Sequence, residues 1–181
     1  MLLTLTPHPD TPCEAVTRIE VNLARAAPAS LALRYLVTGD IASVRWPEPV
    51  ERARADELWK HSCFEAFIRP ADDDAYYEIN LSPSNRWAGY RFDRYRAGMA
   101  SPTGLALTHL TWRTSANLFE LVATLDLAGQ ADLTVDRAVR LGLSAVVEET
   151  NGAKSYWALA HAPGKPDFHH PDAFAAILEP A

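Results

Sequence analysis

Hydrophobic and polar residues alternate along much of this chain. Successive side chains of a β-strand point to opposite faces of the sheet, so a period of two predicts strands with one buried face. In the segment 118–127, Phe119 and Leu121 fall on one face, whereas Glu120 and Thr124 fall on the other. The same alternation predicts nine strands, at 16–23, 31–38, 62–69, 76–82, 87–93, 105–113, 118–127, 139–147 and 155–161, while a last run at 174–178 could be a strand or one helical turn.

Short clusters of proline, glycine, asparagine and aspartate separate the predicted strands, and these residue types favour turns. Helical periodicity is scarce. Only the polar, charged segment 47–57 interrupts the pattern, and we expect it to be an exposed loop that could contain a helical turn. We therefore predict an all-β fold: an antiparallel β-sandwich of the jelly-roll or immunoglobulin-like kind with few helices, in a single domain over residues 1–181.

Composition narrows the classes of partner. The chain is 48% hydrophobic and 22% charged, which is ordinary for one globular domain. Its formal net charge of −6 argues against a nucleic-acid partner, because such proteins usually carry a basic face. No segment reaches the roughly 18 apolar residues of a membrane span, and residues 1–15 lack the pattern of a signal peptide. We expect a cytoplasmic protein without nucleic-acid or membrane partners.

Motifs for metals, cofactors and common catalytic groups are missing from the sequence. Cys13 and Cys63 are its only cysteines, and neither belongs to a Cys-x-x-Cys motif or to the Cys/His spacing of a zinc site. There is no Gly-x-Ser-x-Gly elbow, Gly-rich phosphate loop or dinucleotide-binding fingerprint. We therefore predict no catalytic residue, no metal and no cofactor.

Polar side chains inside the strands 62–69 and 76–82 are the strongest candidates for a site. Glu65, Glu78 and Asn80 lie among aromatic and apolar neighbours, where an unpaired polar group would be costly to bury. Whether Glu65 and Glu78 share a face depends on the register across the intervening turn. An odd sum of paired residue numbers puts them together, and an even sum puts them on opposite faces; the sequence leaves both open.

Two carboxylates on one face would need a cation, an arginine or ligand hydroxyls between them. An ordinary salt bridge, a ligand site and a metal site are all compatible with the sequence. The candidate arginine partners are Arg34, Arg91 and Arg96. In principle the same two carboxylates could also act as a glycosidase pair, although nothing in their spacing requires it.

Aromatic residues accompany these polar groups. Trp59, Trp87 and Trp157 each lie near a predicted strand end or loop. Indole rings can pack on the C–H faces of sugars, and amphipathic aromatic rings are common at interfaces. The alternative is that some of these rings simply fill the core.

The segment 155–174 holds a further group of polar residues. His161, His169 and His170 lie near Asp167, but adjacent histidines in a strand would face opposite ways. Proline and glycine at 163–166 indicate a tight, irregular loop. The histidines could bond backbone groups there, contact a sugar or bind a metal. Lys165 is the residue of this loop best suited to reach a ligand hydroxyl or carboxylate.

Three long motifs carry a family resemblance: LWKHSCFEAFI, YYEINLSPSNRWAGYRFDRYRAGM and SYWALAHAPGKPDFHHPDAF. With them, residues 17–178 resemble the DOMON-like domains related to carbohydrate-binding module family 9. The resemblance is most specific to the bacterial subgroup labelled after UDP-N-acetylenolpyruvylglucosamine reductase. Reductase activity is not implied, since the chain has no flavin-binding domain.

The resemblance implies a β-sandwich with a ligand pocket on one sheet or at its rim. Members of this family bind sugars or, in other branches, haem through Met and His ligands, for which Met99 would have to serve here. In the sugar-binding members two tryptophans clamp a terminal sugar, and Trp87 and Trp157 could form such a clamp.

The sequence therefore favours a non-catalytic domain that binds a carbohydrate or another small polar ligand. The predicted site comprises Glu65, Glu78, Asn80, Trp87, Trp157 and Lys165. The alternatives are an enzyme that acts on a sugar through Glu65 and Glu78, a haem-binding domain, and a purely structural or partner-binding sandwich.

Overall fold

The computed structural model describes residues 1–27, 29–133 and 137–180. Its strands are β1 (Leu2–Pro7), β2 (Val16–Ala27), β3 (Ser30–Gly39), β4 (Ala53–Arg54), β5 (Cys63–Pro70), β6 (Tyr76–Leu81), β7 (Arg86–Phe92), β8 (Ala106–Thr114), β9 (Leu118–Asp126), β10 (Val139–Glu148), β11 (Lys154–Ala158) and β12 (Ala176–Leu178). Helix in the described residues is limited to three short 3₁₀ turns, η1 (Ile41–Ser43), η2 (Leu58–Lys60) and η3 (Pro171–Ala173). The prediction of an all-β fold with few helices is confirmed.

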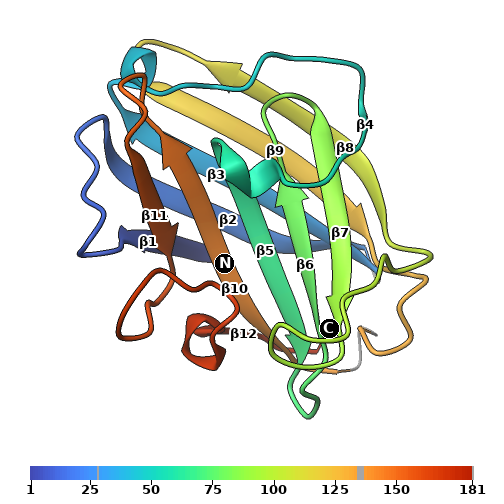
Figure 1. The fold of residues 1–181 in the computed structure, drawn as a ribbon. Coiled ribbons are helices and arrows are strands. Elements are labelled where there is room, and N and C mark those ends of the chain that lie inside the picture. The colour runs from blue at the N-terminus through green and yellow to red at the C-terminus, as the bar shows by residue number, and fades with distance from the viewer. Residues whose placement is uncertain (28, 134–136, 181) are drawn as a thin grey trace.

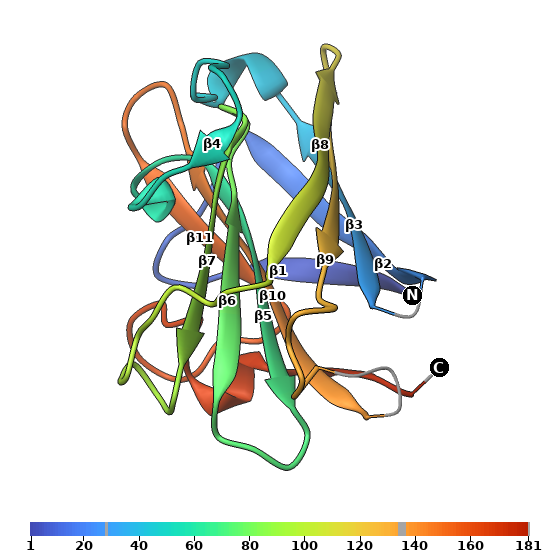
Figure 2. The ribbon, with the colours of Figure 1, turned by 90° about the vertical axis from the view of Figure 1, so that its right-hand side faces the viewer.

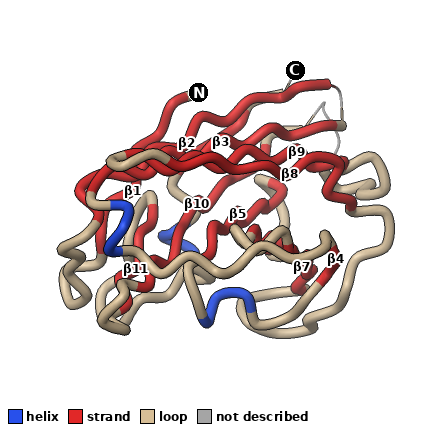
Figure 3. Tube along the Cα trace, turned by 90° about the horizontal axis from the view of Figure 1, so that it is seen from above, coloured by secondary structure: helices blue, strands red, loops and turns tan. Residues whose placement is uncertain are grey.

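All the main strands belong to one sheet. Their order is β4-β7-β6-β5-β10-β11-β1-β2-β3-β9-β8, with β12 paired to β10. The sheet curls so that its two halves face each other, as Figures 1 and 3 show. β1 joins the halves, because it pairs with β11 on one side and with β2 on the other.

Two details of the predicted sandwich need correction. A sandwich has two separate sheets, whereas here β1 makes the sheet continuous, in the shape of a half-barrel. The alternation of apolar and polar residues did not predict β1. The sheet is also mixed, since β4 runs parallel to β7 within the otherwise antiparallel pairings of the described strands. The jelly-roll or immunoglobulin-like arrangement is therefore not confirmed.

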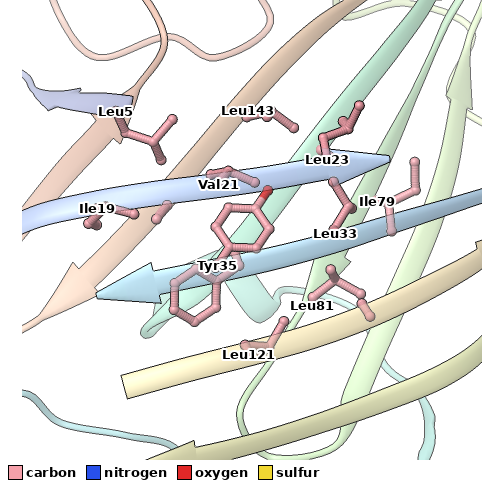
Figure 4. Packing of buried hydrophobic residues seen from close by; sticks show 14 of the residues in the cluster. Leu5, Ile19, Val21, Leu23, Leu33, Tyr35, Ile79, Leu81, Leu121 and Leu143 are labelled. Atoms are coloured by element: carbon pink, nitrogen blue, oxygen red, sulfur yellow. The ribbon is translucent and has the colours of Figure 1, made fainter. Parts of the chain in front are cut away.

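The two halves of the sheet face each other in Figure 2, and the main hydrophobic core fills the space between them, as the side chains in Figure 4 show. Tyr35 and Leu121 reach it from one half, and Ile79 and Leu143 reach it from the other; all are at most 1% exposed. Burying each such side chain contributes about 1.5–3 kcal/mol. The Tyr35 hydroxyl also donates a hydrogen bond of 2.7 Å to the Glu65 carbonyl oxygen, which fixes β5 against the core.

The central strands of one half are buried on both faces. Every residue of β6 and nearly every residue of β5 is buried. On the face away from the main core lies a second, smaller apolar cluster, which contains Phe67, Tyr76, Ala88, Tyr90, Phe92 and Phe174. Loops after β7 and β11 contribute to the cover of this face, which holds the candidate site.

Two ambiguous segments have clear structures. The run 174–178 follows η3 and contains β12, so it is mostly strand. The segment 47–57 is a loop that contains β4, and the 3₁₀ turn η2 follows it directly. Within the described residues, no helix is long and apolar enough to cross a membrane.

Candidate functional site

The register between β5 and β6 settles the question of the two carboxylates. Glu65 pairs with Asn80, and Phe67 pairs with Glu78, which is the odd-sum register. Paired residues of antiparallel strands point to the same face, so Glu65, Glu78 and Asn80 lie together on the face away from the main core. Ser144 on β10 pairs with Glu65 and joins this face from the other side.

A cleft of about 400 Å³ opens on this face. Its floor crosses neighbouring strands in spatial order, with Tyr90 on β7, Glu78 on β6, Glu65 on β5, Val146 on β10 and Tyr156 on β11. Phe92 at the end of β7 also lines the cleft. Three segments outside these strands complete the lining: η2 contributes Trp59, the loop after β7 contributes Arg96 and Met99, and the loop after β11 contributes Pro166, Phe168 and His169.

Glu65 has a buried carboxyl group that receives little hydrogen bonding from the rest of the protein. Its side chain is 3% exposed. The Ser144 hydroxyl donates one long hydrogen bond of 3.5 Å to Oε2, and Oε1 has no partner in the structure. Burial, together with the nearby charge of Glu78, raises the pKa of Glu65 well above its usual value of 4.5.

Glu78 and Asn80 form a hydrogen-bonded pair beside it. Asn80 Nδ2 donates to Glu78 Oε1 at 2.7 Å, whereas Asn80 Oδ1 is buried without a partner. Burial raises the pKa of Glu78, although the Asn80 hydrogen bond and the charge of Arg96 oppose the rise. Asn80 is fully buried behind the cleft and does not line it. Unsatisfied buried acceptors of this kind call for a donor.

A hydrogen-bonded chain connects the cleft to the loop after β7. The Arg96 backbone N–H donates to the Tyr76 hydroxyl at 3.2 Å, and that hydroxyl lies 2.7 Å from His169 Nδ1. The geometry favours donation from Tyr76 to Nδ1, which leaves the His169 proton on Nε2, 3.6 Å from Glu78 Oε2. Burial and the Arg96 charge lower the pKa of His169 to about 4, so its ring is neutral at physiological pH.

Asp167 ties the two loops of the cleft together. Its carboxylate accepts hydrogen bonds from the Tyr95 hydroxyl at 2.5 Å and from Arg96 Nη2 at 2.7 Å. It also accepts one from the His169 backbone N–H at 3.1 Å. Gly98 directly follows the tight turn that Arg94 and Ala97 close with backbone hydrogen bonds. Glycine is needed there, because its φ of +70° is left-handed and a Cβ would lie 2.2 Å from the Asp93 carboxylate.

Aromatic rings form the two ends of the cleft. At one end Trp59, 40% exposed, meets Tyr90 edge to face, with ring centroids 6.2 Å apart. The Tyr90 hydroxyl donates to Asp56 at 2.6 Å, which holds the ring in place. At the other end Tyr156 and Phe168 pack with centroids 6.1 Å apart. The cleft thus combines a polar floor with apolar ends, an arrangement typical of small-ligand sites.

The structure brings Glu65, Glu78 and Asn80 together but places the other predicted residues elsewhere. Trp87 pairs with Leu81 and Trp157 pairs with Ala145, so both indoles lie on the core face of the sheet. Trp157 is 3% exposed, and neither ring borders the cleft. The predicted clamp of these two tryptophans therefore has no place at this cleft.

Lys165 is also outside the lining. It is exposed on the loop after β11, next to Pro166, which does line the cleft. The three arginines proposed as partners of Glu65 and Glu78 pair elsewhere: Arg34 with Glu120, Arg91 with Asp93 and Arg96 with Asp167. Among the described residues, no arginine forms an ion pair with either glutamate.

Sequence reasoning did not assign Tyr156, Phe168, His169 or Met99 to the site. Tyr156 pairs with Val146 on β10 and therefore points to the same face as Ser144. This pairing depends on the register between β10 and β11, which the sequence alone does not fix. Nor do the histidines form the metal site considered for this segment: no group of three or more His, Cys, Asp or Glu side chains in the described ranges could hold a metal ion.

Comparisons with known proteins give likeness in structure only. No protein-family model matches the chain, and no curated protein matches it in sequence. A candidate carbohydrate-binding protein from Bacteroides uniformis ATCC 8492 superposes with a TM-score of 0.69 at 16% identity, over 98% of this chain and 84% of that one. A carbohydrate-binding module of family 9 from Caldicellulosiruptor kristjanssonii, in complex with glucose, gives 0.52 at 10% identity, over 91% and 76%. At these identities the chain shares the fold of both proteins.

Proposed function

We propose that this protein is a non-catalytic carbohydrate-binding domain whose ligand lies in the cleft over β5, β6, β7, β10 and β11. The observation that carries the proposal is the pair of buried carboxyl groups, Glu65 and Glu78, on the floor of a cleft with aromatic ends. The shared fold supports it, since the family 9 module of that fold was solved with glucose.

The division of roles follows from the chemistry of the lining. Glu65 and Glu78 would accept hydrogen bonds from ligand hydroxyls, which satisfies oxygens that otherwise lack a donor. Trp59 at one end and Tyr156 with Phe168 at the other would pack on the apolar C–H faces of a sugar ring. A ligand without donors would leave the buried carboxyl groups unpaired, so the site discriminates by hydrogen bonding as well as by shape.

Such a small, partly open cleft would bind weakly, roughly −4 to −7 kcal/mol, which corresponds to millimolar to ten-micromolar dissociation constants. We further infer a distant relation to the family 9 modules and to the DOMON-like domains. It is supported by the shared fold and by the hairpin motif that carries Glu65 and Glu78.

A glycan array followed by calorimetry on simple sugars tests this function. We expect a hit among monosaccharides or disaccharides, and we expect Glu78→Gln to weaken it by about 1–3 kcal/mol without unfolding the protein. The matched control is Glu20→Gln, the same change on a carboxylate that pairs with Arg18 at the surface. An array without any bound carbohydrate would contradict the proposal.

The catalytic alternative has one observation in its favour. Glu65 and Glu78 lie on one face and line one cleft, as a glycosidase pair would have to. A glycosidase pair needs one carboxyl group protonated and the other ionised, and burial raises the pKa of both groups here. Incubation with aryl glycosides should release no phenol, and sustained release that Glu65→Gln abolishes would favour the enzyme instead.

A haem site fits the residues poorly. Met99 and His169, the candidate ligands, both line the cleft. Yet His169 Nδ1 is bonded to Tyr76, and its Nε2 faces the buried carboxyl of Glu78 at 3.6 Å. Iron on Nε2 would have to enter the 3.6 Å between that nitrogen and the buried Glu78 carboxyl oxygen, so we derive no role for haem.

A further inference from the structure

The floor of the cleft offers acceptors and almost no donors. Glu65 Oε1 has no partner, and Glu65 Oε2 receives only the long bond from Ser144. Glu78 Oε1 is bonded to Asn80, whereas Glu78 Oε2 has only the His169 ring at 3.6 Å. A ligand that fits this floor must therefore bring several donors to one place.

The cleft is also short of positive charge. In the described part of the chain, Arg96 and His169 are the only basic residues in its lining. Arg96 is already paired with Asp167, and burial keeps His169 neutral at physiological pH. Besides the two glutamates, the other ionisable groups in the described lining are Tyr90 and Tyr156, neither of which carries positive charge. Tyr76 is bonded to His169 but does not line the cleft. Lys165 is exposed on the neighbouring loop and outside the lining.

Two buried carboxyl groups beside each other cannot both ionise cheaply. Each has its pKa raised, chiefly by burial, and for Glu65 also by the charge of Glu78. A cation bound between them would remove this repulsion and allow both to ionise. The aromatic ends favour an organic cation, since the faces of Trp and Tyr attract ammonium groups.

We infer that the cleft selects a sugar that carries a protonated amine, an amino sugar with a free ammonium group, over the neutral sugar of the same shape. The inference rests on the proposed function and names its ligand class. The ammonium group donates three hydrogen bonds toward Glu65 and Glu78, and the pyranose ring packs against the aromatic residues.

An inorganic cation fits the same carboxyl groups less well. Calcium takes six to eight oxygen ligands, and no cluster of three or more candidate ligand side chains exists in the described residues. The lining is mostly apolar, with Trp59, Phe92, Val146 and Phe168 around the two glutamates. Such walls suit the C–H surface of a sugar rather than a hydrated metal ion.

The test is calorimetry at neutral pH with three ligands: glucosamine, glucose and N-acetylglucosamine. Acetylation removes the charge of the amine while it keeps the ring, so the third ligand controls for the substituent. We expect glucosamine to bind roughly tenfold or more tightly than either neutral sugar, as a charge-assisted contact predicts. Glu65→Gln should reduce that preference to near one, whereas Glu20→Gln should leave it unchanged.

The outcomes separate the inference from the function on which it rests. Equal binding of all three sugars overturns the charge preference and leaves carbohydrate binding intact. If the protein binds none of these three sugars and no other sugar on the array, both the inference and the proposed function are contradicted. Because the comparison of the three sugars uses the unchanged protein, it decides the question even if Glu65→Gln fails to fold. Displacement of glucosamine by calcium would assign the carboxyl groups to a metal instead.

Discussion

Glu65 is the residue whose ionisation couples the site to the stability of the fold. It is buried on β5, and Ser144 is the only hydrogen-bond donor to its carboxyl group among the described residues. An ionised carboxylate in such a place costs free energy, so the folded state favours the neutral acid. The site is therefore less stable empty than filled by a donor.

This predicts a pH dependence of stability with a definite sign. The folded pKa of Glu65 lies above the unfolded value of 4.5, so between the two the folded protein holds a proton that the unfolded chain has released. The contribution of Glu65 to the stability of the folded state is fully present below pH 4.5, and it is lost as the pH rises toward the folded pKa. Glutamine does not titrate, so Glu65→Gln should gain stability relative to wild type as pH rises. Urea melts across pH check this, and a constant difference would contradict it.

Two tryptophans should respond differently to the same substitution. Trp157 is 3% exposed in the main core, so Trp157→Ala should cost about 3–5 kcal/mol of unfolding free energy. Trp59 is 40% exposed at the end of the cleft, so Trp59→Ala should cost about 1 kcal/mol or less and mainly weaken sugar binding. Thermal melts with calorimetry separate the two effects. If Trp59→Ala leaves the affinity unchanged, the ring is not part of the site.

At this scale the sequence singled out the polar residues that lie together at the cleft, but it left open whether the tryptophans border a site or fill the core. Glu65, Glu78 and Asn80 stood out because charged and amide groups inside strands need a partner. The sequence did not show which face Trp87 and Trp157 occupy, because their strands, β7 and β11, are buried or half-buried on both faces. The alternation of apolar and polar residues identifies the buried face of a strand only where the other face is exposed to solvent.

Among the elements, β1 shows what alternation can miss. Its six residues are mostly exposed or half-buried, and only Leu5 is buried. A strand with a single buried side chain gives almost no periodic signal. Nevertheless β1 joins the halves of the sheet through β11 and β2, whereas most of the longer strands lie near their predicted positions.

The importance of β1 can be tested within the strand itself. Leu5 is 2% exposed and packs in the main core, so Leu5→Ala should cost about 2–5 kcal/mol of unfolding free energy. Leu2 on the same strand is 61% exposed, so Leu2→Ala should change stability by less than about 0.5 kcal/mol. Denaturant unfolding of the two variants measures the contrast. Equal, small losses would show that β1 does not contribute to closing the sheet.

For the molecule as a whole, the curled sheet has one face in the core and leaves the other face of its β5–β6–β7–β10–β11 half for a site. Two loops distant in sequence meet over that face through Asp167, and together with η2 they border the cleft. The all-β class could be predicted from alternation alone. The meeting of these loops could not, because it depends on strand order and register rather than on any local pattern.

The central claim is that a sugar binds in this cleft, and the five tryptophans of the chain allow a direct test. Only Trp59 among them lines the cleft in the described residues, whereas the other four pack against or within the main core. The measurement is a titration of the ¹⁵N-labelled protein with glucosamine and glucose, following the indole N–H signals, with Trp59→Phe to assign one of them. We expect the Trp59 signal to shift progressively with ligand concentration, while the signals of the core indoles move little. Saturable shifts confined to the core indoles, or none at ligand concentrations well above millimolar, would contradict it.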